Sequence, residues 1–298
     1  MSKIVECIPN FSEGRDMRCI EELAVVSGSV PGVTLLDYSS DANHNRSVFT
    51  LIGDPCGIEE VAFQLCKKAS ELIDMTKQSG EHPRMGATDV IPFVPVREVS
   101  ADECVAISVR VAKRIWEELG IPSFLYEYSA TSDARRNLAN VRKGQFEGMP
   151  EKLLADEWAP DFGERKIHPT AGITAIGARP PLIAYNVNLD TPDLEIANEI
   201  AKVIRESSGG FKSCKAIGIY LKDRNIAQVS MNMVNCEETP IYKVFEAIRI
   251  EAERRGACIA GSELIGLAHA KALIDCAEYY LQIEGFDYKT QVLENHLL

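Results

Sequence analysis

Positive charge is scarce in this chain. Its 298 residues include 32 lysines and arginines against 44 aspartates and glutamates, so the formal net charge is −12. A surface of that sign repels phosphate backbones, and the sequence predicts no nucleic-acid partner, while a local basic pocket for a small polyanion stays open. Long apolar runs are also missing: no stretch approaches the ~20 residues of a membrane span, and residues 1–6 show no secretory signal. We expect a cytoplasmic protein with no membrane partner.

Common metal-binding and catalytic signatures are absent as well. The nine cysteines are an odd number scattered through apolar stretches, without a Cys-x-x-Cys pair or a zinc-like Cys/His spacing. We interpret them as reduced core thiols and expect no metal site. The sequence also has no Gly-x-Ser-x-Gly elbow, no P-loop lysine motif, no His-Glu-x-x-His and no Gly-x-Gly-x-x-Gly. A Rossmann nucleotide site is therefore not supported.

Length and composition are those of a two-domain globular protein. Apolar residues make up 46% and charged residues 26% of the chain, which is ordinary globular usage. At 298 residues the chain is long for one core, and the Pro180-Pro181 pair is a natural joint. We therefore expect an N-terminal lobe over 1–179 and a C-terminal lobe over 180–298.

Hydrophobic spacing predicts the elements of the first lobe. A long amphipathic helix should have Asp54 as its N-cap and Pro55 at its first position, with one apolar face up to Ile73. The other expected elements are a strand at 3–9, a helix at 12–26, strands at 33–36 and 47–52, a polar loop at 38–45, a strand at 90–96, a helix at 101–119, and strands at 124–128 and 172–177. Residues 130–170 carry several glycines and prolines and predict short helices and loops.

The second lobe repeats the order of the first. The expected elements are strands at 182–189, 216–221, 226–233 and 257–260 and helices at 191–206, 239–255 and 269–282. Each lobe then has the order strand, helix, strand, strand, helix, strand of a ferredoxin-like fold. The predicted class is α+β, with two ferredoxin-like (βαββαβ) lobes and helices outside; the uncovered faces of the two sheets could pack on each other, with a ligand between them.

The segment Glu81-His82-Pro83-Arg84-Met85-Gly86 has the clearest chemistry around any of the five histidines. It stands between the long helix and an apolar strand, where an imidazole with a reference pKa of about 6.5 can shuttle protons. Arg84 should project to the same side as His82 and clamp a carboxylate, and Glu81 could tune the imidazole. The alternative is a histidine that only ends the helix or fills the turn before Pro83.

Two other polar segments offer candidate substrate ligands. Residues 37–46 crowd aspartate, asparagine, histidine and arginine between two strands, and they supply Asn45 and Arg46. Asn10 follows the first strand where a helix is expected to begin, so that nearby backbone N–H groups can face an anion. The alternatives are a solvated surface loop at 37–46 and an ordinary helix start with Ser12 as N-cap.

A third region suits a flat ring with an acidic tail. Trp158 and Phe162 stand in a loop with glycine and proline, where they would flank a heterocycle or form a small satellite core. Basic side chains follow that could meet the acid tail of a ligand, namely Arg165, Lys166 and His168. The sequence His168-Pro169-x-x-Gly172-x-Thr174 also echoes His82-Pro83-x-x-Gly86-x-Thr88, through common ancestry or by chance.

Several longer motifs stand in one order along the chain. They are Val5-Glu6-Cys7-Ile8-Pro9-Asn10-Phe11-Ser12-Glu13-Gly14, Glu81-His82-Pro83-Arg84-Met85-Gly86-Ala87-Thr88-Asp89-Val90, Pro150-Glu151-Lys152-Leu153, Glu157-Trp158-Ala159-Pro160-Asp161-Phe162-Gly163, Ala227-Gln228-Val229-Ser230-Met231-Asn232 and Gly261-Ser262-Glu263-Leu264-Ile265-Gly266-Leu267. Over nearly the whole chain these motifs resemble glutamate formiminotransferases. The resemblance implies two α/β lobes with a folate tunnel between their sheets. It also implies transfer of a formimino group between N-formimino-L-glutamate and tetrahydrofolate.

The same resemblance implies residues and partners. The motif histidine, His82, corresponds to the family's catalytic residue, and tetrahydrofolate is a co-substrate, with no metal. The implied folate contacts are Gly163, Glu164, Arg165, Lys166, Ile167, His168, Pro169, Thr170, Ala171, Gly172, Gly218, Tyr220, Gln228 and Asn232. A homodimer is expected, and a separate cyclodeaminase should act on the product, because the chain is too short to include the one fused to the animal enzyme.

Three points stay open. Some family members carry an aspartate where this chain has Ser39, so support for His82 would fall to Asp37, Asp41 or water. The enzyme could be a glutamate formyltransferase that uses N-formylglutamate and 5-formyltetrahydrofolate, and glycine could replace glutamate as acceptor. A different class is a non-catalytic ligand-binding or RNA-binding module on ferredoxin-like folds, although the acidic charge and the lack of an aromatic RNP motif argue against RNA.

Overall fold

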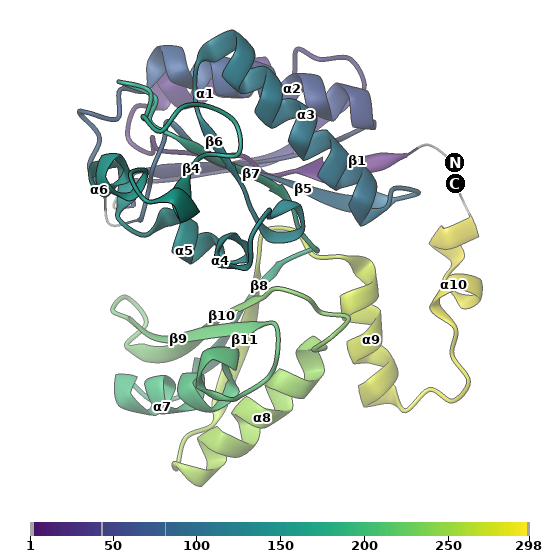
Figure 1. The fold of residues 1–298 in the computed structure, drawn as a ribbon. Coiled ribbons are helices and arrows are strands. Elements are labelled where there is room, and N and C mark those ends of the chain that lie inside the picture. Colours follow the sequence, from purple (N-terminus) through teal and green to yellow (C-terminus); the bar gives the residue numbers. More distant parts are fainter. Residues whose placement is uncertain (1–2, 43, 81, 297–298) are drawn as a thin grey trace. The chain divides into compact units, whose positions relative to one another are not determined.

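The protein has a mixed α+β structure with two sheets, here given by a computed structural model that describes residues 3–42, 44–80 and 82–296. The chain divides into two compact units, Met1–Arg179 and Pro180–Leu298 (Figure 1). Glu81, which was expected to tune His82, lies outside the described residues. The tunnel expected between the lobes stays a prediction.

Unit 1 is built on a seven-stranded sheet. Its strands are β1 (Ile4–Cys7), β2 (Asn10–Phe11), β3 (Val33–Asp41), β4 (Arg46–Gly53), β5 (Thr88–Arg97), β6 (Ser123–Leu125) and β7 (Thr174–Ala178). Its helices are α1 (Met17–Ser27), α2 (Pro55–Leu72), α3 (Ala101–Leu119), α4 (Asp133–Arg136), α5 (Leu138–Arg142) and α6 (Gln145–Lys152), with short 3₁₀ turns at Glu127–Ser129 and Asp156–Trp158.

The sheet of unit 1 is larger than the four strands of a ferredoxin-like lobe. Strands β1 and β2 lie in one line between β4 and β5, and β3 pairs with the outer side of β4, all antiparallel. Beyond β5 the sheet continues with β7 and β6, both parallel. A parallel neighbour needs a crossover connection, and α3 begins the one that leads through β6 to β7. The predicted strand–helix order is therefore present in β1-α1-β3-β4-α2-β5, followed by an extension.

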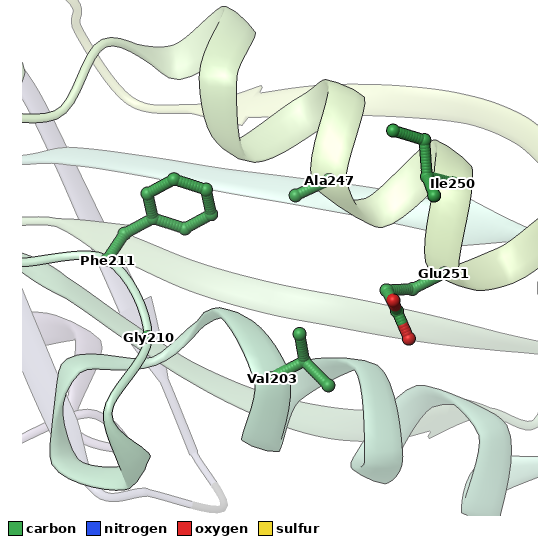
Figure 2. A pocket seen from close by; sticks show the side chains of 6 residues that line it. All are labelled: Val203, Gly210, Phe211, Ala247, Ile250 and Glu251. Carbon is green, nitrogen blue, oxygen red and sulfur yellow. The ribbon is translucent and has the colours of Figure 1, made fainter.

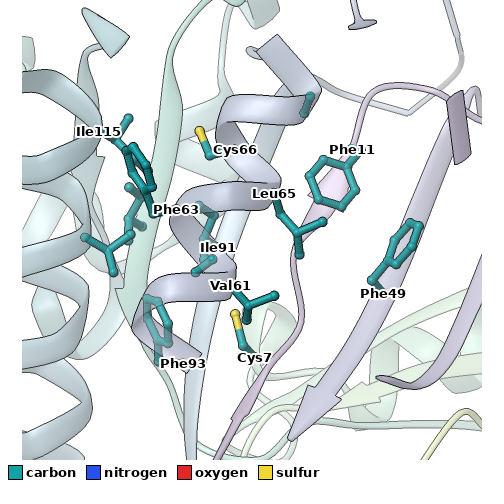
Figure 3. Packing of buried hydrophobic residues seen from close by; sticks show 14 of the residues in the cluster. Cys7, Phe11, Phe49, Val61, Phe63, Leu65, Cys66, Ile91, Phe93 and Ile115 are labelled. Atoms are coloured by element: carbon teal, nitrogen blue, oxygen red, sulfur yellow. The ribbon is translucent and has the colours of Figure 1, made fainter. Parts of the chain in front are cut away.

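Helices cover the two faces of this sheet unequally. Helices α1, α2 and α3 lie on one face, where their apolar sides close the main core with Phe11, Phe49 and Phe93 (Figure 3). On the opposite face, α5 and α6 bury a smaller cluster that includes Val90, Phe124, Val141 and Met149. This second cluster covers β5, β6 and β7, and it includes no residue of β2 or β4.

Local signals placed one helix correctly and misplaced the start of another. Asp54 caps α2, with its carboxylate accepting from the N–H groups of Cys56 and Gly57 at 3.0 Å, and Pro55 occupies the first turn, as predicted. Helix α1 begins at Met17, not near Ser12, and its N-cap is Asp16. Ser12 instead donates its hydroxyl to the Gly86 carbonyl at 2.7 Å. A long-range partner thus outcompetes the local cap that the sequence offered.

The polar loop predicted at 38–45 is wrong. Strand β3 continues to Asp41 and pairs residue by residue with β4, with Ser39 opposite Val48 and Asp41 opposite Arg46. Its polar residues are exposed, so they carried no apolar alternation to predict a strand. The reversal is short, and Asn45 supports it in a left-handed conformation with φ of 50°.

Unit 2 is a four-stranded antiparallel sheet with helices packed on one face. Its elements are β8 (Ile183–Leu189), α7 (Leu194–Ile204), β9 (Cys214–Leu221), β10 (Ile226–Met233), α8 (Ile241–Arg254), β11 (Ile259–Ile265), α9 (Ala270–Leu281) and α10 (Tyr288–Gln291), with 3₁₀ turns at Glu206–Ser208 and Leu293–His296. The strand order is β11-β8-β10-β9. The predicted hairpin is confirmed as β9 and β10, whereas the last strand begins two residues later than expected and continues to Ile265.

None of the cysteines in the described part of the chain forms a disulfide. Five are buried, namely Cys7, Cys19, Cys66, Cys104 and Cys214. Burial raises the pKa of the Cys66 thiol to about 12. Cys56 and Cys258 are exposed. No helix among the described residues has both the length and the apolar character needed to cross a bilayer.

Candidate active site

His82 contacts Arg46, the first residue of strand β4. The Arg46 guanidinium donates from Nη1 to His82 Nε2 at 2.7 Å. Arginine has N–H donors and no acceptor, so Nε2 must be the unprotonated acceptor and Nδ1 carries the proton of a neutral imidazole. Arg46 and Val48 alternate along β4 with the buried Ser47 and Phe49, which places Arg46 on the face opposite α1 and α2.

The electrostatic surroundings also keep His82 neutral. Burial, together with the positive charges of Arg46 and Arg142, lowers the pKa of His82 to about 4, while the carboxylate of Asp89 opposes this shift. The nearby His44 ring, with its centroid 6.2 Å from that of His82, acts in the same direction as the cations. At neutral pH the ring is therefore unprotonated, and its protonated form is a stronger acid than an ordinary imidazolium.

Asp89 and Arg142 are an ion pair that sequence reasoning missed. Asp89 is only 2% exposed; one carboxylate oxygen accepts from the N–H of Met85 at 3.0 Å, and the other pairs with Arg142 of α5. Asp89 could have been suspected as a lone charge in the apolar run before Val90. Arg142 gave no local signal, because it reaches the site from a segment 53 residues further along the chain.

Of the acidic residues proposed to support His82, one lies next to the neighbouring histidine and the other lies on strand β3. Asp41 contacts His44, with 3.3 Å between its carboxylate and Nδ1, and also accepts from the His44 N–H at 2.9 Å. Asp37 and Ser39 are exposed on β3. The carboxylate that acts on His82 electrostatically to the greatest extent is Asp89.

Asn45, predicted as a substrate ligand, joins three segments of unit 1. Its side-chain oxygen accepts from the Gly14 N–H at 2.9 Å, and its amide donates to the Ser79 carbonyl at 3.1 Å and to Gln78. Gln78 in turn donates to Glu13 at 2.8 Å. At 2% exposure Asn45 has both ends of its amide engaged within the protein, which indicates a structural role.

Arg84, predicted to clamp a carboxylate beside His82, is engaged in the same way. It is 7% exposed and donates to the Gln78 carbonyl at 2.6 Å, to Glu147 at 2.7 Å and to Gln145 at 3.1 Å. The expected alternation failed because the segment before β5 is not an extended strand. Arg84 ties the histidine loop to α6, and Arg46 is the cation that touches His82.

Asn10 lies on the same sheet face as Arg46. It pairs with Val48 of β4, the residue opposite Ser39, so the three occupy one row across β2, β4 and β3. Paired residues on neighbouring strands project to one face. The Asn10 amide donates to the Ile8 carbonyl at 2.9 Å, and the residue is half-buried.

The two His-Pro segments that echo each other lie side by side. Gly86 bridges to Gly172, Ala87 donates to the Ala171 carbonyl at 2.9 Å, and Ile173 donates to the Met85 carbonyl at 3.1 Å. His168 has a different neighbourhood from His82. Its Nδ1 accepts from the N–H groups of Ala171 and Thr170, at 3.0 and 3.4 Å, so it closes its own turn.

The predicted folate stretch from Gly163 to Gly172 is part exposed and part core. Glu164, Arg165 and Lys166 are exposed, whereas Ala171 and Gly172 are buried against the histidine loop. Trp158 and Phe162 do not flank one slot, because Trp158 packs on Phe124 in the smaller cluster and Phe162 on the main core. Of the two interpretations offered for this aromatic pair, packing against the cores holds.

In unit 2 the candidate folate residues fall on two faces of the sheet. Gly218 pairs with Val229, and Tyr220 pairs with Ala227, both of which face the core under α7. A side chain at Gly218 would collide with Asn198 of α7. Gln228 and Asn232 occupy the opposite face, where Gln228 donates to Asn188 at 2.7 Å, so the four residues do not form one surface.

An apolar groove of about 410 Å³ also lies in unit 2, between α7 and α8 (Figure 2). Its lining is Val203, Gly210, Phe211, Ala247, Ile250 and Glu251. The single ionisable group there, Glu251, is already paired with Arg254 and Arg255. The groove therefore offers no acid–base chemistry. Within the described residues, no group of three or more histidine, cysteine or acidic side chains is arranged to hold a metal ion.

Comparison with known proteins decides the family. A model of the formiminotransferase domain, N-terminal subdomain, matches residues 4–179, and a model of the formiminotransferase domain matches residues 184–295. The chain belongs to the formiminotransferase family. Glutamate formimidoyltransferase of Streptococcus pyogenes serotype M1 is 68% identical over 298 residues, which cover all of both chains.

More distant family members fall into two sizes. Glutamate formimidoyltransferase of Thermoplasma acidophilum is 46% identical over 95% of this chain and 94% of its own length. Formimidoyltransferase-cyclodeaminase of Gallus gallus is 45% identical over 95% of this chain, which corresponds to 53% of that protein. The formiminotransferase chain is thus similar both to proteins of its own length and to about half of a longer one.

Proposed function

We propose that this transferase moves a formimino group from N-formimino-L-glutamate to tetrahydrofolate, giving 5-formiminotetrahydrofolate and glutamate. Similarity along the whole chain to relatives named glutamate formimidoyltransferase supports the reaction. The observation that carries the chemistry is the neutral imidazole of His82, whose Nε2 is an acceptor in a half-buried, positively charged setting.

One imidazole can perform both proton transfers of this reaction. The folate N5 attacks the amidine carbon, a C–N bond forms, and the attacking nitrogen loses its proton to His82 Nε2. The resulting imidazolium, with a free-protein pKa of about 4, is a stronger acid than an ordinary imidazolium and returns that proton to the departing glutamate nitrogen as the old C–N bond breaks. Protons and charge balance without a covalent enzyme intermediate.

The cations around His82 suit an anionic substrate. Arg46 and Arg142 are both close enough to act on the imidazole, and Arg142 is held by Asp89. Substrate carboxylates would be oriented by Arg46 and by the amide of Asn10 in the same face of the sheet. Such positioning removes part of the entropic barrier. Arg84 and Asn45 would act indirectly, by holding the loops that carry the histidine and Arg46.

Folate contacts are proposed for a smaller set than the resemblance implied. The exposed Glu164, Arg165 and Lys166 suit a ligand with an acid tail, although Arg165 already contacts Asp156 at 2.7 Å. In unit 2, Gln228 and Asn232 share a polar sheet face with Asn188 and are retained. Tetrahydrofolate is a co-substrate in this proposal, and no metal takes part.

The finer architecture and the cellular setting are part of the proposal. We infer ferredoxin-like cores, which the order β8-α7-β9-β10-α8-β11 and the sheet order β11-β8-β10-β9 support. The catalytic lobe would be residues 1–179 and the second lobe 180–298. A cytoplasmic homodimer and a separate cyclodeaminase for the product rest on the family resemblance, since the Gallus gallus relative is named for both activities.

The direct test is product formation from defined donors. The purified protein is incubated with tetrahydrofolate and N-formiminoglutamate, N-formylglutamate or N-formiminoglycine, and the folate product is identified by mass. We expect 5-formiminotetrahydrofolate from the first donor and little product from the others. Faster transfer from N-formylglutamate would replace the proposal with a formyltransferase, and no transfer from any donor would contradict both.

A further inference from the structure

The nitrogen that should act as base is blocked in this structure. His82 Nε2 has a single lone pair, and the Arg46 guanidinium occupies it at 2.7 Å. A nitrogen in that state cannot accept a proton from substrate, because each lone pair accepts one hydrogen bond or one proton. Nδ1, the other ring nitrogen, carries the proton of the neutral tautomer. Turnover therefore requires Arg46 to leave His82.

A substrate carboxylate is the natural agent of that departure. A charge-assisted guanidinium–carboxylate bond is roughly twice as strong as one to a neutral acceptor, and it can be bidentate. Asp89, the buried acid whose charge acts on His82, already pairs with Arg142 and accepts from the Met85 N–H. Burial lowers the pKa of Arg46, so an arriving anion would relieve the cost of its partly desolvated charge.

We propose that Arg46 is a specificity-determining residue that blocks the basic nitrogen of His82 in the resting enzyme and releases it when a carboxylate of an amino-dicarboxylate substrate takes the guanidinium. This inference rests on the proposed function. Only a noncovalent exchange is involved: one N–H···N bond breaks, one or two N–H···O bonds form, and His82 keeps its Nδ1 proton throughout.

The consequence is that substrate charge controls kcat as well as KM. A neutral analogue that fills the same space leaves Arg46 on His82, so it binds without generating the base. The charged and titratable groups that act on His82 are Arg46, Arg142, Asp89 and His44, and Asp41 acts through its contact with His44. Among these, Arg46 donates a hydrogen bond to the ring and Arg142 acts through its charge, which makes Arg142 a matched control.

The first experiment follows the imidazole itself and needs no turnover. The ring nitrogens of labelled histidine are observed by NMR, and His82→Ala identifies the His82 signals among those of the five histidines. L-Glutamate should change the Nε2 signal from a hydrogen-bonded to a free acceptor, whereas L-glutamine should not. Arg142→Gln should keep this response, and Arg46→Met should show a free acceptor before any ligand is added.

The second experiment compares N-formiminoglutamate with its α-amide, in which the carboxylate beside the amidine is neutral. In the wild type we expect kcat on the amide to be roughly 10–10²-fold lower, the scale of one charge-assisted hydrogen bond. Arg46→Met should narrow this ratio by raising kcat on the amide above the wild-type value. Arg46→Lys, which keeps the charge and a donor, should preserve the anion preference.

The two experiments separate failure of this inference from failure of the proposed function. Transfer from N-formiminoglutamate together with an Nε2 signal that ignores L-glutamate would overturn the inference alone. Equal losses of kcat on both substrates in Arg46→Met would also overturn it, because a purely structural or binding residue gives that pattern. A responsive Nε2 signal without any formimino transfer would support the blocking role and contradict the proposed function.

Discussion

Two copies of one short motif lie next to each other in unit 1 and have different surroundings. His82-Pro83-x-x-Gly86 and His168-Pro169-x-x-Gly172 are joined by the Gly86–Gly172 bridge and lead into the parallel strands β5 and β7. His168 accepts hydrogen bonds from the backbone of its own turn. His82 has a charged partner from another strand and is flanked by a second cation. The difference teaches that the motif itself builds a turn, and that β4 and α5 give charged neighbours to the His82 copy.

The largest expected effect comes from removing the imidazole of His82. His82→Ala should lower kcat by roughly 10²–10⁴-fold, because general acid–base help is lost. His168→Ala, measured in the same assay at a temperature where it is folded, should stay within a few-fold of the wild type. If the two variants lost activity equally, the division of tasks between the copies would be wrong.

The bridge between the two copies can be broken at a glycine. Gly172 has φ of 71°, and a Cβ there would stand 2.3 Å from the Met85 carbonyl oxygen. Gly172→Ala should lower the free energy of unfolding by roughly 2–4 kcal/mol, through strain and overlap together. Gly256→Ala is the control, since Gly256 has φ of 73° and no heavy atom near its Cβ.

Denaturant unfolding of both variants measures the difference. The control should lose about 1–2 kcal/mol, the cost of the left-handed conformation alone. Equal losses in the two variants would mean that the close approach of the two motif copies adds nothing to stability.

The pH dependence of kcat/KM should report the charged neighbourhood of His82. The base form of this residue predominates above its pKa of about 4, so activity should fall as pH decreases through that value. An isolated imidazole would give a limb near the reference value of about 6.5 instead. Arg142→Gln removes a cation that lowers the pKa, and its acid limb should move to higher pH. A limb unaffected by this substitution would show that Arg142 does not act on His82.

The smallest effect is expected from the turn-forming copy. His168→Ala removes the acceptor of the Ala171 N–H, and thermal unfolding should show a loss of about 1 kcal/mol. His168→Asn offers a side-chain acceptor of similar reach and should recover part of this loss. An unchanged melting temperature in His168→Ala would mean that the turn is held by Gly172 and its partners alone.

Sequence periodicity predicted the framework of both units because apolar faces and caps are local. Helix α2, with Asp54 and Pro55, and the hairpin of β9 and β10 needed no distant partner to be recognised. Strand β3 was missed beyond Leu36 because its residues there are polar and exposed, so they show no alternation of apolar and polar side chains. The extension by β7 and β6 depends on parallel pairing across a long crossover, which local spacing does not encode.

The candidate site was predicted only as far as the segment that carries it. His82 and Arg46 stood out as chemically active types near strand ends, but their 2.7 Å contact follows from the loop and β4 meeting in space. Arg84 was expected beside His82, yet it turns toward Gln78, Gln145 and Glu147, because the loop before β5 is not extended. Arg142 comes from residues 130–170, for which the sequence predicted only short helices and loops.

Because the cysteine thiols differ in burial, their reactivity can report local unfolding of the protein. Thiolate-dependent reagents should modify the exposed Cys56 and Cys258 at once, while the five buried cysteines react only after their surroundings open. Four of these, Cys7, Cys19, Cys66 and Cys104, lie in unit 1, and Cys214 lies in unit 2. Peptide mapping after timed alkylation can thus tell which half of the chain loosens first.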